Sequence, residues 1–66
     1  MGVLEEYLKY CLHMAMRDNP QVFMHQAFGG VQYYLFVWQD EEDEVCKMWN
    51  EYKPLFEELI YGGPAP

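Results

Sequence analysis

The stretch that decides the fold runs Phe28-Gly29-Gly30-Val31-Gln32-Tyr33-Tyr34-Leu35-Phe36-Val37-Trp38, a glycine pair followed by the most β-prone run of the chain. Valine, tyrosine, phenylalanine and tryptophan are enriched in β-strands. Two glycines can adopt the positive φ angles of a two-residue hairpin turn. We therefore predict an antiparallel hairpin that pairs residues 21–28 with residues 31–38.

Alternation along such a hairpin gives it two different faces. The core residues expected from its second strand are Val31, Tyr33, Leu35 and Val37. The aromatic residues expected on the opposite face, where a partner would bind, are Phe23, Tyr34, Phe36 and Trp38. Large aromatic side chains dominate the energetics of many interfaces, which favours a binding role for this second face.

A competing interpretation makes residues 20–28 a short helix, with Asn19 as N-cap, Pro20 at the first position and Gly29 just past the end. Residues 31–38 would then form a lone strand, and a mostly α protein would have to pair that strand across a dimer. We favour the hairpin, because a lone strand leaves its own backbone groups without partners.

Helices are predicted on both sides of the hairpin. Over residues 3–17, polar residues recur at every fourth position, which is typical of an amphipathic helix. Its predicted apolar face consists of Leu4, Tyr7, Leu8, Cys11, Leu12 and Ala15. Asp18-Asn19-Pro20 should end this helix, since proline excludes the α conformation for the residue before it.

The second helix is predicted to begin at Asp40, which can act as its cap, and to stop at Gly62. Its predicted apolar face consists of Val45, Met48, Trp49, Tyr52, Phe56 and Leu59. Pro54 should kink this helix or start a separate helical piece. The sequence thus predicts an α+β fold of the order αββα, as one domain over residues 1–61 with a flexible tail at 62–66.

A chain of 66 residues is near the lower limit for a self-sufficient hydrophobic core. Aromatic residues make up 18% of this chain, and so small a body cannot bury all of them. Exposed aromatic surface favours association, so we expect a homodimer or a bound partner.

The formal net charge is −7, and residues 34–66 hold eight acidic but only two basic residues. Direct binding to nucleic acid is disfavoured, because it needs clustered lysine and arginine. The acidic run consists of Asp40, Glu41, Glu42, Asp43 and Glu44. This run is either a solvated helix N-terminus or a patch that docks on a basic protein.

Features expected of an enzyme or a metal protein are weak. The chain has no serine or threonine, which removes two common nucleophiles. The candidate metal ligands Cys11, His13, His25 and Cys46 are poorly spaced for zinc. Both cysteines fall on predicted apolar helix faces, as small buried hydrophobes or as an inter-helix disulfide. We predict no catalysis, no cofactor and no metal.

No segment resembles a signal peptide or a membrane span, so we expect a cytoplasmic protein with no membrane partner. The leading hypothesis is a non-catalytic, acidic protein-interaction module that binds a basic protein. Phages and mobile elements use small acidic proteins of this kind to block host proteins, an analogy of size and charge alone. The alternative is a self-associating structural or assembly subunit.

Overall fold

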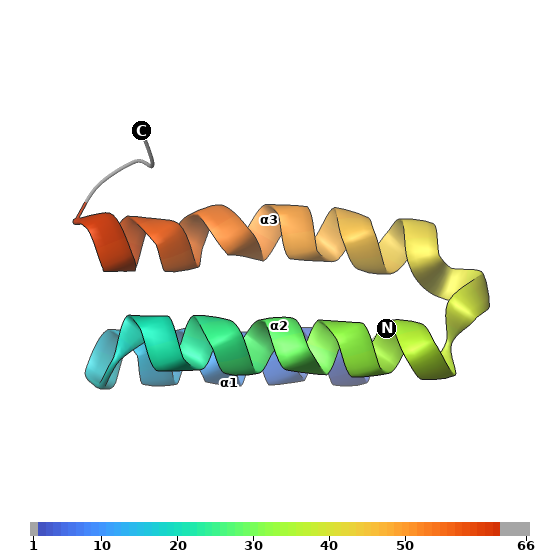
Figure 1. Cartoon of the computed structure of the whole chain (residues 1–66), viewed down its shortest axis with the longest axis horizontal. Helices are drawn as coiled ribbons and strands as arrows, with labels where there is room; N and C mark the ends of the chain where they lie inside the picture. Colours follow the sequence, from blue (N-terminus) through green and yellow to red (C-terminus); the bar gives the residue numbers. More distant parts are fainter. Residues whose placement is uncertain (1, 63–66) are drawn as a thin grey trace.

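The computed structural model describes residues 2–62, and three α-helices form most of this part. They are α1 (Gly2–Arg17), α2 (Pro20–Val37) and α3 (Glu42–Tyr61), with a 3-10 turn, η1 (Gln39–Glu41), before α3. Figure 1 shows the helices side by side, with successive helices running in opposite directions. Residues 2–62 contain no strand, so the predicted αββα fold and its α+β class are wrong. The fold is a three-helix bundle.

The start of α2 agrees with the competing interpretation, in which a helix begins at Pro20 with Asn19 as its N-cap. Asn19 has extended backbone angles, and its side-chain oxygen accepts hydrogen bonds from the amides of Gln21 (3.0 Å) and Val22 (3.4 Å). Pro20 occupies the first helical position, where its missing amide hydrogen costs nothing. The predicted stop at Gly29 is wrong, because α2 continues to Val37 and ends where the Trp38 amide donates to the Tyr34 carbonyl (2.8 Å). The lone strand of that interpretation is therefore wrong as well.

Backbone hydrogen bonding explains why the helix replaces the hairpin. A two-stranded hairpin leaves its outer backbone groups unpaired and is marginally stable alone, whereas a helix satisfies these groups internally. Aromatic and β-branched residues disfavour a helix by only about 0.5 kcal/mol each relative to alanine. Gly29 and Gly30 have negative φ angles, since Gly62 is the only described residue with a positive one. The glycine pair is neither a hairpin turn nor a helix stop.

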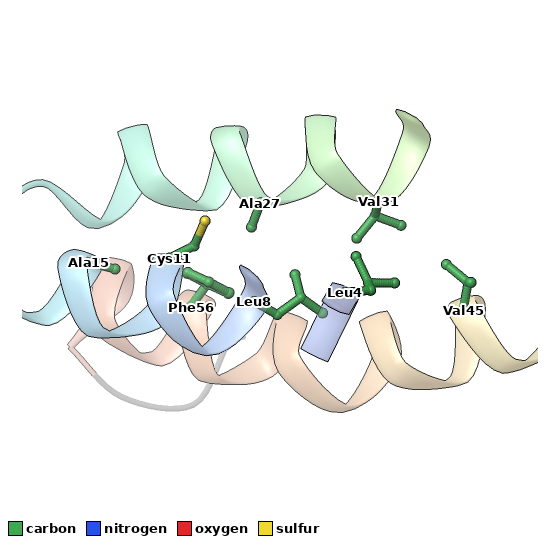
Figure 2. Packing of buried hydrophobic residues seen from close by; sticks show 8 residues of the cluster. All are labelled: Leu4, Leu8, Cys11, Ala15, Ala27, Val31, Val45 and Phe56. Carbon is green, nitrogen blue, oxygen red and sulfur yellow. The ribbon is translucent and has the colours of Figure 1, made fainter. Parts of the chain in front are cut away.

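All three helices contribute to the core. Its buried residues are Leu4, Leu8, Cys11, Ala15, Ala27, Val31, Val45 and Phe56 (Figure 2). The apolar face predicted for residues 3–17 is confirmed, since Tyr7 and Leu12 also pack against this cluster.

The core face predicted for residues 31–38 is largely wrong. Val31 is buried and Leu35 is half-buried, but Tyr33 is 71% exposed and Val37 is 47% exposed. A helix repeats every 3.6 residues, so residues two apart point to different sides, whereas in a strand they share a face. The predicted alternation of core and surface residues is therefore wrong, because it assumed that residues 31–38 form a strand.

Most of the prediction for α3 holds. Val45 and Phe56 are buried, and Met48, Trp49 and Tyr52 pack against them, but Leu59 is exposed. The helix runs through Pro54 without interruption, so the predicted separate piece is wrong.

The ends of α3 differ from each other in how well they were predicted. Asp40 is not its cap, because it lies in η1 and Glu41 precedes the first α-helical turn without a side-chain cap bond. Gly62 ends the helix as predicted: its φ is 74°, and its amide donates to the Glu58 carbonyl (2.9 Å). Residues 63–66 of the predicted tail lie outside the described residues.

The two cysteines have different surroundings. Cys11 is buried as predicted, whereas Cys46 is exposed, contrary to the prediction, and both thiols are free. Burial raises the pKa of the Cys11 thiol, which keeps it protonated and unreactive at neutral pH. The structure therefore holds no disulfide between the two residues.

Candidate functional site

A groove of about 840 Å³ lies between the first half of α1 and the second half of α2. We call it the aromatic groove. Its lining residues are Gly2, Val3, Leu4, Tyr7, Gly30, Tyr33, Tyr34, Trp38 and Glu41. Because α1 and α2 are antiparallel (Figure 1), the beginning of one helix lies beside the end of the other. Residues from both helices line the groove.

A contact between Tyr7 and Gly30 forms the floor of the groove. The Tyr7 hydroxyl donates a hydrogen bond to the Gln26 carbonyl (3.0 Å), which lays the tyrosine ring across α2. A Cβ atom added at Gly30 would overlap this ring, with Tyr7 Cδ2 only 2.9 Å away. Burial is the main cause that raises the pKa of Tyr7. Gly30 is therefore the residue that lets the two helices approach closely here.

Three of the lining residues, Tyr34, Trp38 and Glu41, come from the end of α2, the residue after it and η1. The Tyr34 hydroxyl donates to Oε2 of Glu41 (3.0 Å), and the rings of Tyr34 and Trp38 are 6.1 Å apart between centroids. Desolvation, followed by the hydrogen bond to Glu41, raises the pKa of Tyr34. Tyr34 is thus a protonated donor at neutral pH, and it fixes the position of the Glu41 carboxylate.

The sides of the groove are apolar and open to solvent. Val3 is 80% exposed on α1, and Trp38 is 50% exposed at the end of α2. Tyr33 lies on the rim. Exposed apolar and aromatic residues gathered in one groove are typical of a binding surface.

Among the described residues, the one charged side chain that lines the groove is Glu41. The rest of the acidic run is next to Glu41 in η1 and the first turn of α3. Within residues 2–62 the one ion pair joins Lys9 to Glu5 (3.6 Å), so no lysine or arginine in that range neutralises Glu41. Within the described residues, the groove therefore combines an apolar lining with one carboxylate that no lysine or arginine pairs.

The structure brings together three of the predicted site residues, Tyr34, Trp38 and Glu41. It separates two others from them: Phe36 is on the opposite side of α2, and Phe23 is half-buried against the core. The remaining members of the acidic run, Asp40, Glu42, Asp43 and Glu44, are exposed next to the groove.

Sequence reasoning missed the other six residues that line this groove, Gly2, Val3, Leu4, Tyr7, Gly30 and Tyr33. The spacing of Gly30, Tyr34, Trp38 and Glu41, at intervals of three and four residues, was the available signal. That signal can be recognised only if residues 30–37 are taken as helical and residues 39–41 as a turn that follows.

The described residues contain no group of three histidine, cysteine, aspartate or glutamate side chains placed to hold a metal ion. His13 and His25 are exposed, whereas Cys11 is buried. No described helix has the length and apolar character needed to cross a membrane. Comparison with protein-family models, curated proteins and solved structures finds no match for this chain.

Proposed function

We propose that this protein is a non-catalytic interaction module whose aromatic groove binds a basic amphipathic helix of another protein. The observation that carries the proposal is the apolar groove that ends at Glu41. Aromatic walls supply affinity for apolar anchors, and an acidic end selects a partner with lysine or arginine beside those anchors.

The dimensions of the groove support a short helical ligand. The α2 residues that line it run from Gly30 to Trp38, a rise of about 12 Å at 1.5 Å per residue. This length matches about two turns of a second helix, which would present apolar side chains at positions i and i+4. Val3 and Trp38 would hold these side chains from opposite walls.

Charge favours a basic ligand over a second copy of this chain in the groove. The chain carries −7, and its acidic run is at the groove end, so another copy would bring a like-charged molecule to this end. A lysine or arginine of the ligand would instead meet Glu41, whose carboxylate is already held by Tyr34. The pairing would also speed association at low salt.

Selection from a random library of displayed helical peptides tests the proposal. The wild-type protein should enrich peptides with two apolar residues four positions apart and a neighbouring lysine or arginine. Enriched peptides should bind more weakly at high salt, because salt screens the contribution of the acidic run. Enrichment of acidic or uncharged peptides would contradict the proposal.

Two variants locate the binding surface. Val3→Asp puts a charge on the apolar wall, and Glu41→Lys reverses the charge at the groove end; each should weaken an enriched peptide by about tenfold, the equivalent of about 1.4 kcal/mol. The matched control is Glu51→Lys, the same change at an exposed position of α3 that does not line the groove. Equal binding by all three variants would show that the peptides bind elsewhere.

For the biological role we keep the prediction made from size and charge. It is that the module blocks a basic protein, in the manner of small phage or mobile-element inhibitors.

A further inference from the structure

Four aromatic side chains and one carboxylate line the aromatic groove. The aromatic residues are Tyr7, Tyr33, Tyr34 and Trp38, and the carboxylate belongs to Glu41. An aromatic ring is more than an apolar surface, because its face carries partial negative charge and attracts cations. The groove therefore offers a cation two kinds of attraction in one place, to ring faces and to a carboxylate.

The hydroxyl groups of two of these tyrosines are held by bonds within the protein. Tyr7 donates to the Gln26 carbonyl (3.0 Å), and Tyr34 donates to Oε2 of Glu41 (3.0 Å). Both side chains thus present mainly ring surface to a ligand. The rings of Tyr34 and Trp38 are 6.1 Å apart between centroids and tilted by 37°. Since a cation is attracted to a ring within about 6 Å of its centroid, one cation can interact with both rings and with Glu41.

These contacts suit a quaternary ammonium group better than the ammonium group of an unmodified lysine. A lysine ammonium has three N–H donors, and each of them needs an acceptor when it leaves water for an apolar groove. Glu41 is the one charged acceptor among the described lining residues, and one of its oxygens already accepts from Tyr34. A trimethylated ammonium group has no N–H donor, and it presents methyl groups to the ring faces. Aromatic rings are the usual means by which proteins recognise such groups.

We propose that the cation selected by the aromatic groove is a quaternary ammonium group, carried on the partner helix as the side chain of a trimethylated lysine. This inference rests on the proposed function, because it names the cation of the same ligand. Trp38 and Tyr34 contact the methyl groups, and Glu41 balances the positive charge. Within residues 2–62 no lysine or arginine forms an ion pair with Glu41, so the ligand cation displaces no ion-pair partner there.

The size of the groove favours a cation that is attached to a chain over a small free one. A trimethylammonium group has the size of a tert-butyl group and fills only a small part of about 840 Å³. The rest of the lining, which includes Val3 and Gly30, is apolar. It can hold the neighbouring apolar side chains of the partner helix.

Choline and its neutral carbon analogue, 3,3-dimethylbutan-1-ol, test the ammonium site without any partner protein. The two molecules have the same shape, but only choline carries the positive charge. Choline should bind about fivefold more tightly, with a dissociation constant on the order of 1 mM for so small a ligand. Sodium chloride replaces choline chloride in the reference sample, so that the ionic strength stays constant.

The two tryptophans provide the readout and its internal control. Trp38 lines the groove, whereas Trp49 packs near Phe28 and Phe56 and does not line it. In two-dimensional proton–nitrogen NMR spectra, choline should shift the indole N–H signal of Trp38 and leave that of Trp49 in place. The variant Trp49→Phe assigns the two signals.

Two variants test the two attractions separately. Trp38→Leu keeps an apolar side chain but removes a ring, and Glu41→Gln keeps an oxygen that can accept from Tyr34 but removes the charge. Each should weaken choline binding by about fivefold and change binding of the neutral analogue by less than about twofold.

The matched controls are Phe36→Leu and Glu51→Gln, the same kinds of change at exposed positions that do not line the groove. Both should bind choline like wild type. Circular dichroism identifies any variant that loses its helices. Tyr33→Leu, at a lining position that is 71% exposed, then takes the place of that variant.

A peptide enriched in the library selection tests whether the group is carried by a helix. Its lysine is synthesised unmodified, trimethylated, and as the neutral carbon analogue of trimethyllysine. The trimethylated peptide should bind about fivefold more tightly than either of the others. Equal binding of the trimethylated and unmodified peptides would overturn the assignment to a partner helix, and selective binding of choline would then identify a small free ligand.

The ammonium site is overturned if choline and its neutral analogue bind equally, if choline shifts the signal of Trp49 instead of Trp38, or if Trp38→Leu and Glu41→Gln both bind choline like wild type. The two proposals also fail separately. Selective choline binding without enrichment of basic helices contradicts the proposed function. Enrichment of basic helices without selective choline binding contradicts the ammonium site alone.

Discussion

Helices α2 and α3 have similar lengths but opposite compositions. Charged side chains cover the outer side of α3, and its apolar residues form one stripe that buries Val45 and Phe56. Helix α2 has no aspartate, glutamate, lysine or arginine and buries only Ala27 and Val31, although it contacts both other helices. Charge therefore fixes which side of α3 faces solvent, whereas α2 keeps uncharged surface on several sides. Part of that surface lines the aromatic groove.

The difference between α2 and α3 predicts that the stability of the fold depends most on the apolar residues of α3 that pack into the core. Phe56→Ala should lower the free energy of unfolding by about 3–5 kcal/mol, because Phe56 is fully buried and its removal leaves a cavity. This loss is comparable to the total stability of about 3–10 kcal/mol expected for a domain of this size. Urea denaturation followed by circular dichroism measures it. Leu55→Ala, at an exposed neighbouring position, is the control and should cost less than about 1 kcal/mol.

Trp49 links the two helices and should have the next largest effect. Its ring centroid is 5.7 Å from that of Phe28 on α2 and 6.1 Å from that of Phe56. Because Trp49 is only half-buried, Trp49→Ala should cost about 2 kcal/mol, less than truncation of a fully buried aromatic residue. Trp49→Phe, which keeps an aromatic ring, should recover more than half of this loss in the same urea titration. A loss below about 0.5 kcal/mol would mean that α3 does not rely on this stack.

The glycine pair gives a test within α2 itself. Substitution by alanine at these two adjacent positions should change the free energy of unfolding in opposite directions. Gly29→Ala should raise the free energy of unfolding by about 0.5–1 kcal/mol, because the added methyl group meets nothing and alanine favours a helix. Gly30→Ala should lower it by about 1–2 kcal/mol, since the methyl group would displace the Tyr7 ring. Both are measured by thermal and urea denaturation. Stabilisation by Gly30→Ala would contradict the close packing of α1 on α2.

The smallest effect is expected from the hydrogen bond between Tyr34 and Glu41. Partial burial and then Glu41 raise the pKa of Tyr34 above 10.0, so the folded state favours the protonated phenol. Its contribution to stability is complete below pH 10 and is lost as pH rises through the folded-state pKa, because the unfolded chain releases the proton first. Stability of the parent should therefore fall more steeply above pH 10 than that of Tyr34→Phe. Parallel curves would rule out this linkage.

The interpretation of α1 and α3 succeeded because charge marks their solvent sides. In α1, polar residues at every fourth position define one side, and the remaining apolar residues include its four buried ones, Leu4, Leu8, Cys11 and Ala15. In α3, the acidic first turn marks the start of the helix, and the apolar residues from Val45 to Phe56 mark the side that faces the core. The cap at Asp40, the separate helical piece at Pro54 and the burial of Cys46 and Leu59 were wrong.

The interpretation of α2 failed because no charged residue marks a period along it. Phe23, Ala27, Val31 and Tyr34 do follow helical spacing towards the core, but apolar residues between them hide this pattern. The aromatic groove was only partly predictable for the same reason: Tyr34, Trp38 and Glu41 were identified as site residues, but their grouping depends on a helix. Val3 and Tyr7 come from α1, and no local pattern connects them with α2.

The sequence by itself determined several of the positions at which helices begin and end. Caps, proline and charge act on the backbone of only a few neighbouring residues, so these signals can be recognised without the tertiary structure. Asn19 with Pro20, the acidic turn before α3 and Gly62 are all such local signals. Only the tertiary structure decided which residues of α1 and α2 meet, because the ring of Tyr7 packs against Gly30 and the two residues are far apart in the sequence. This packing within the bundle brings residues of both helices together in the aromatic groove.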